Sequence, residues 1–78
     1  MSEQVYVLHI YNQGWDCTCE AEAIVSGGFE ALVCCRSLLK DQATAQLRGS
    51  GVYQTACQAL DDAKGLAIKW AYENRKHL

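Results

Sequence analysis

The side chains best suited to chemistry in this sequence are five cysteines and a histidine near its beginning. The cysteines stand at positions 17, 19, 34, 35 and 57, and the histidine is His9. Imidazole and thiolate are common zinc ligands, and a thiol beside an imidazole is also a common nucleophile. Two kinds of site therefore need to be weighed, a zinc centre and a Cys–His pair.

The strand pairing derived below gathers His9, Cys17, Cys19 and Cys35 on one face of a sheet. Neighbouring side chains on such a face point the same way and do not converge on a tetrahedral centre, and the Cys-x-x-Cys spacing of zinc knuckles is missing. A packed helix over that face would also exclude substrate. We interpret the thiols as small core side chains, expect no cofactor and no enzymatic activity, and keep a metal or thiol site at these four residues as an alternative.

Three other motifs are structural in this interpretation. Ser26-Gly27-Gly28 and Gly49-Ser50-Gly51 are too short for a phosphate-binding loop, which leads from a strand into a helix, so both are predicted to be turns. Asp61-Asp62 falls near the start of a predicted helix, where carboxylates suit the helix dipole, and is predicted to be a solvated face.

The elements that position these residues begin with strands. Residues 5–11 are rich in β-branched and aromatic side chains, and residues 15–25 place apolar side chains at nearly every odd position. Turn sequences at Asn12–Gly14 and Ser26–Gly28 predict two β-hairpins. A further strand is predicted from Phe29 to Leu38, and after a turn at Lys40–Gln42 a short strand near Ala43 to Leu47.

The register of the hairpins follows from keeping apolar residues opposite apolar residues. This criterion favours a three-residue loop in each hairpin. The predicted pairs are Tyr11 with Trp15, His9 with Cys17, Val7 with Cys19, Val25 with Phe29, Ala23 with Ala31, Ala21 with Val33, and Cys19 with Cys35.

From Thr55 the apolar period becomes helical, with a stripe that runs from Ala56 to Trp70. Thr55 and Gln58 are spaced as a capping box, and basic residues at 75–77 complement the far end of the dipole. The sequence therefore predicts a helix over about 55–75. The predicted fold class is α+β, an antiparallel sheet of three to five strands packed on one C-terminal helix, in a single domain over residues 1–78.

Composition narrows the function classes. Nine acidic and seven basic residues give a formal net charge of −2, and no basic cluster precedes Arg75-Lys76, so nucleic acid is not the expected partner. No secretory signal and no apolar run of membrane-spanning length is visible, so the expected location is the cytoplasm, without a membrane partner. The odd cysteine count fits reduced thiols there.

A surface for a protein partner is the strongest functional expectation. Apolar residues predicted on the sheet face opposite the helix, or on the outer side of the helix, suggest either a partner surface or a homodimer. The predicted partner-binding residues are Tyr6, Leu8, Ile10, Glu20, Glu22, Leu32, Arg36, Ile68 and Tyr72. The alternative is that residues 37–47 form a second layer that covers this face.

Part of the sequence resembles a known family. Thr55 to Trp70, read as Thr-x-x-Gln-Ala-Leu-x-x-Ala with Trp70 near its end, is similar to the single helix of HicB-type antitoxins, and Gly14-Trp15 resembles their strand entry. The resemblance implies a protein that binds and blocks a toxin ribonuclease, although the DNA-binding tail is missing and an extra Gly-Gly hairpin is present. In size, acidity and layout the chain also looks like small phage-encoded inhibitors, including anti-CRISPR proteins, which implies occupation of a host protein surface.

Overall fold

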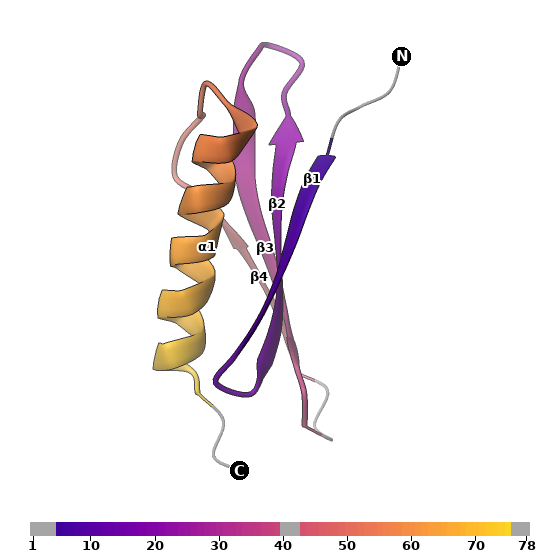
Figure 1. Cartoon of the computed structure of the whole chain (residues 1–78), viewed down its shortest axis with the longest axis vertical. Coiled ribbons are helices and arrows are strands. Elements are labelled where there is room, and N and C mark those ends of the chain that lie inside the picture. The colour runs from indigo at the N-terminus through magenta and orange to yellow at the C-terminus, as the bar shows by residue number, and fades with distance from the viewer. Residues whose placement is uncertain (1–4, 40–42, 76–78) are drawn as a thin grey trace.

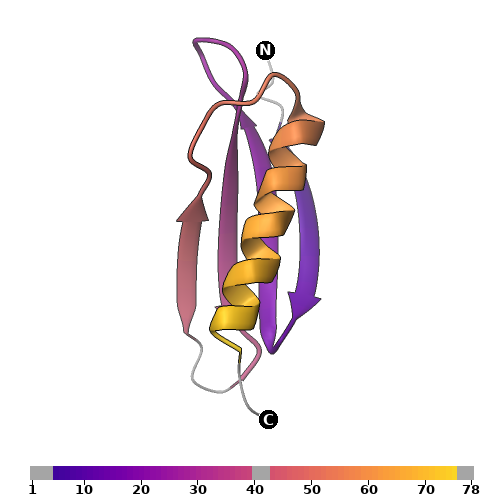
Figure 2. The ribbon, with the colours of Figure 1, turned by 90° about the vertical axis from the view of Figure 1, so that its left-hand side faces the viewer.

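The computed structural model describes residues 5–39 and 43–75. Within these residues it has four strands, β1 (Val5–Asn12), β2 (Trp15–Ala23), β3 (Phe29–Ser37) and β4 (Thr44–Arg48), and one helix, α1 (Ala56–Glu73). The strands form one antiparallel sheet in the order β1-β2-β3-β4, and α1 packs on one of its faces (Figures 1 and 2). The predicted fold class is confirmed. The fourth strand lies where it was predicted, within one residue, and the predicted turn at Lys40–Gln42 lies outside the described residues.

The predicted register of the first hairpin is wrong by one residue. Asn12 pairs with Trp15 around a two-residue turn, in which Gln13 and Gly14 have φ of 52° and 85°. Two successive left-handed residues form the turn whose twist matches that of paired strands, and this outweighs the cost of a left-handed glutamine. A slip of one residue turns every side chain of a strand over. The helix side of β1 therefore carries Tyr6, Leu8 and Ile10, and the opposite side carries Val7, His9 and Tyr11.

The register of the second hairpin differs from the prediction by two residues, which preserves the faces. Ala23 pairs with Phe29 and Cys17 with Cys35, around a loop over residues 24–28. Gly28 has φ of 90°, and a Cβ there would lie 2.6 Å from Val52 Cγ1, so this position requires glycine. The Tyr53 backbone exchanges hydrogen bonds of 2.8 and 2.9 Å with Phe29 and forms a single β-bridge at the start of β3.

The helix begins as predicted. Thr55 Oγ1 accepts a hydrogen bond of 3.1 Å from the Gln58 N–H, and Gln58 Oε1 accepts one of 3.2 Å from the Gln54 N–H. At the other end, Arg75 donates to the Tyr72 carbonyl oxygen and its guanidinium lies 4.8 Å from the centre of the Tyr72 ring. Lys76 and His77, the other predicted dipole partners, lie outside the described residues.

The core between α1 and the sheet is built from small side chains. The helix contributes a fully buried stripe of Ala59, Ala63, Ala67 and Ala71, and the sheet contributes Cys17, Cys19, Ala21, Ala31, Val33 and Cys35. Such residues let a helix approach a sheet closely. Near the C-terminal end of α1, Trp15 packs edge-to-face on Trp70 with ring centroids 4.6 Å apart. The predicted alanine stripe and its Trp70 anchor are confirmed.

Candidate functional site

The structure separates the residues of the alternative metal or thiol site. Cys17, Cys19 and Cys35 point toward α1, whereas His9 pairs with Thr18 and lies on the opposite face. Within the described residues no group of three or more His, Cys, Asp or Glu side chains is placed to hold a metal ion. The predicted juxtaposition of His9 with Cys17 is wrong, because it depended on the three-residue loop of the first hairpin.

The three core thiols are also poorly suited to act as nucleophiles. Each is fully buried, and burial raises the pKa of Cys19 to about 11 and that of Cys35 to about 12. Burial also raises the pKa of Cys17. The thiolate is the reactive form, so these cysteines are expected to stay protonated and inert near neutral pH. Their interpretation as small core side chains agrees with this burial.

We expect thiol labelling to divide the five cysteines into two classes. Cys34 and Cys57 are exposed and should react quickly with an aromatic disulfide reagent in the native protein, whereas Cys17, Cys19 and Cys35 should react only on unfolding. The measurement is the number of thiols released per chain with and without denaturant. A third fast thiol that disappears in a Cys17→Ala, Cys19→Ala or Cys35→Ala variant would contradict the packing described above.

The sheet face away from α1, here called the open face, is covered by no other element within the described residues (Figure 1). Residues 44–48, part of the segment predicted to cover this face, instead form the edge strand β4. The central side chains of the open face come from β2, β3 and β4. They are Asp16, Thr18, Glu20, Glu22, Glu30, Leu32, Cys34, Arg36, Thr44, Gln46 and Arg48.

Two ion pairs organise the open face. Arg48 Nη1 lies 2.6 Å from Glu30 Oε2, and Arg36 Nη2 lies 3.4 Å from Asp16 Oδ2. The other Asp16 oxygen, Oδ1, is buried without a hydrogen-bond partner, and His9 Nδ1 lies 3.6 Å from it. These groups hold Asp16 in a fixed position on the sheet although no element packs over it.

Glu20 and Glu22, the remaining acidic residues of the open face, indicate a contact surface. No ion pair within residues 5–39 and 43–75 engages Glu20 or Glu22. Glu20 lines a hollow of about 440 Å³ together with half-buried Leu32 and with Arg48. The open face thus offers a carboxylate beside an apolar side chain in a concave setting. It contains four of the predicted partner-binding residues, Glu20, Glu22, Leu32 and Arg36.

The other predicted partner-binding residues lie on the helix side. Tyr6, Leu8 and Ile10 were predicted on the face opposite the helix, and this is wrong because of the one-residue slip in β1. They flank α1, where Tyr6 and Leu8 share a hollow of about 390 Å³ with Leu60 and Lys64. Ile68 and Tyr72 are exposed on α1 as predicted. We call Tyr6, Leu8, Ile10, Leu60 and Ile68, together with the free backbone edge of β1, the edge surface.

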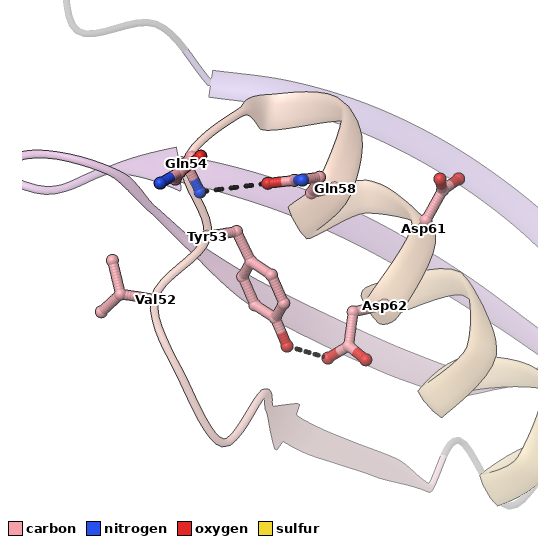
Figure 3. A pocket seen from close by; sticks show the side chains of 6 residues that line it. All are labelled: Val52, Tyr53, Gln54, Gln58, Asp61 and Asp62. Atoms are coloured by element: carbon pink, nitrogen blue, oxygen red, sulfur yellow. Dashed lines mark hydrogen bonds between the residues drawn. The ribbon is translucent and has the colours of Figure 1, made fainter.

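A third hollow lies at the start of α1, and hydrogen bonds link two pairs of the residues that line it. Figure 3 shows Tyr53 reaching from the loop to Asp62, to which its hydroxyl donates, and Gln54 bonding Gln58. The hydrogen bond to Asp62 raises the pKa of Tyr53. This hollow has a volume of about 580 Å³, and the polar atoms of the residues that line it largely form hydrogen bonds within the loop and the start of the helix. Asp61 is exposed as predicted, but Asp62 is half-buried and joins the loop to the helix.

Sequence reasoning missed the Tyr53–Asp62 contact and the Asp16 cluster. Tyr53 and Asp62 are nine residues apart across a loop, and no periodic pattern links them. Asp16 falls on the polar side of an alternating strand, so its burial depends on His9, which the predicted register placed on the other face. The correct two-residue turn would have brought the two together, and the Gln13-Gly14 pair was the available signal.

No helix within the described residues has the length and apolarity needed to cross a membrane. Comparisons with protein-family models, curated proteins and solved structures give no match to this chain, so they neither support nor contradict the resemblance to HicB-type antitoxins and phage inhibitors.

Proposed function

We propose that this protein is a non-catalytic binding module that contacts a protein partner through its open face. The observation that carries the proposal is a four-stranded sheet that residues 5–39 and 43–75 cover on one face only, with Glu20 and Leu32 at a hollow in the other face. Protein interfaces place an apolar side chain at the centre and charged groups around it. On the open face, Leu32 lies between the charged residues Glu20 of β2 and Arg48 of β4.

The charges indicate the chemistry of the partner. Glu30 and Asp16 already pair with Arg48 and Arg36, so Glu20 and Glu22 are the carboxylates available to a partner. A partner surface that presents a lysine or arginine to them, beside an apolar side chain for the hollow, would match in charge and shape. Occupation of a partner's surface is how the small phage-encoded inhibitors that the chain resembles are expected to act. We propose the same mode of action here.

The proposal predicts that reversing one charge on the open face weakens partner binding. Glu20→Lys should weaken binding at least about tenfold, because it replaces an attraction at the hollow by a repulsion. The measurement is affinity capture from cells of the source organism, followed by titration of the purified partner against each variant. Leu32→Asp tests the apolar centre in the same way.

Glu73→Lys is the matched control, because this substitution makes the same charge change at a residue that is exposed on α1, on the other side of the molecule. It should bind as the unmodified chain does. Unchanged binding by both Glu20→Lys and Leu32→Asp would overturn the proposal. Capture of a small ribonuclease would support the antitoxin alternative. Capture of a larger protein assembly would support the inhibitor.

A further inference from the structure

One edge of β1 is paired with no other strand in the described part of the chain, at a place that the proposed function does not use. β1 is the first strand of the sheet, and its only neighbour within the described residues is β2. Asn12 and Trp15 flank a two-residue turn, so they exchange hydrogen bonds with each other. The alternation of an antiparallel ladder then directs the backbone groups of Val7, His9 and Tyr11 away from β2, toward the free edge.

This edge lacks the features that keep an edge strand from pairing. Free edges are normally protected by charged side chains, proline, bulges or short length. β1 is eight residues long and contains no Asp, Glu, Lys, Arg or Pro, and its pairing with β2 is regular throughout. Apolar side chains are exposed on both of its faces, with Leu8 39% exposed on the helix side and Val7 50% exposed on the open side.

We propose that β1 pairs with β1 of a second copy of this chain, in antiparallel orientation, to form a two-fold dimer with one continuous sheet. An antiparallel copy offers the same alternation of donors and acceptors, so the backbone groups of the two edges satisfy each other. Because the strand is uncharged, two copies approach without repulsion between like charges. The interface is the edge surface, and the open faces of the two copies become one surface.

The register follows from matching apolar residues. With the two-fold axis at Leu8, that residue faces its own copy, Tyr6 faces Ile10, and Val7 faces His9. With the axis at His9, Tyr6 would face Asn12 and two imidazoles would meet. The first register buries apolar side chains against one another and is the one we propose.

Charges on the helix agree with this axis. Leu8 lies beside the helical turn that carries Asp61 and Lys64, and α1 runs in the same direction as β1 (Figure 1). A two-fold axis at Leu8 makes the helices of the two copies antiparallel, so this helical turn runs in the opposite direction in the second copy. Lys64 of one copy and Asp61 of the other then lie at the same end of the groove between the two helices, which is a complementary arrangement.

The test is sedimentation equilibrium in reductant over a wide range of protein concentration. The unmodified chain should be a dimer, and Val7→Lys and Leu8→Lys should be monomers with the circular dichroism of the unmodified chain. Gln46→Lys, which adds the same charge to the other edge strand, should remain a dimer. A monomeric unmodified chain, or a dimer that persists in Val7→Lys, would overturn the proposal. Val7 is half exposed, so its replacement by lysine keeps the test valid if Leu8→Lys does not fold.

Cross-linking tests the register separately. In a background with Cys34→Ser and Cys57→Ser, Leu8→Cys should oxidise rapidly to a covalent dimer, because residues opposite each other in a non-hydrogen-bonded pair lie close enough for a disulfide. His9→Cys should cross-link far more slowly, since it faces Val7 of the other copy. Faster cross-linking of His9→Cys than of Leu8→Cys would overturn the axis at Leu8.

Discussion

Trp15→Ala should destabilise the protein more than any other single truncation. Trp15 is only 4% exposed, packs edge-to-face on Trp70, and donates a hydrogen bond of 2.9 Å from Nε1 to the Asn74 carbonyl oxygen. Truncating a buried tryptophan costs about 3–5 kcal/mol, and a domain of this length has a total stability of about 4–12 kcal/mol. The substitution therefore removes a large part of the free energy of unfolding.

The measurement is urea unfolding followed by circular dichroism, which should show a much lower midpoint for Trp15→Ala. Tyr11→Ala is the matched control, because it truncates an aromatic residue of the same hairpin that is 69% exposed, and it should change stability by less than about 0.5 kcal/mol. Trp15→Phe should fall between them, since it keeps an aromatic ring and loses the hydrogen bond. Equal midpoints for Trp15→Ala and the unmodified chain would contradict the assignment of Trp15 as the anchor between β2 and α1.

The elements of this fold could be predicted from the sequence because each has a strong local signal. Strict alternation over residues 15–23 marks a half-buried strand whatever its neighbours are. Thr55, Gln58 and the alanine stripe fix the start, the direction and the buried side of the helix. These signals need no knowledge of the rest of the chain, and the structure places both elements where they were predicted.

The faces of β1 could not be predicted with the same means. Val5 to Tyr11 is apolar on both sides, so its own pattern does not choose a register, and the choice depends on how Gln13 and Gly14 turn. The three-residue loop looked better because it placed apolar residues opposite apolar ones, yet the backbone twist of a two-residue turn decided the register. The wrong placements of His9 and of Tyr6, Leu8 and Ile10 all follow from this slip of one residue. His9 lies on the face opposite the cysteines, and Tyr6, Leu8 and Ile10 lie on the helix side and not on the open face.

A loss of stability at alkaline pH is the second large expected effect, because three thiols are protonated in the fold. Burial raises the pKa values of Cys17, Cys19 and Cys35 above the ordinary value of 9.0. A group whose pKa is raised in the folded state contributes its full stability below the unfolded pKa and loses it as pH rises toward the folded pKa. Between pH 9 and the raised pKa values, Cys19 and Cys35 should each lower the free energy of unfolding by up to about 1.4 kcal/mol per pH unit. Cys17 adds to this loss in the same direction.

The decline is measured by urea unfolding at a series of pH values above 8 in reductant, and a pair of neighbouring cysteines supplies the control. Cys35→Ala should make the decline shallower, because it removes one of the three buried thiols whose pKa is raised in the fold. Cys34→Ala should leave the slope unchanged, since that side chain is exposed on the open face and is solvated in the folded chain as in the unfolded one. Equal slopes for the two variants would mean that other groups, such as Tyr53, set the alkaline limit. The thiols then would not be the buried, protonated side chains that let α1 pack closely on the sheet.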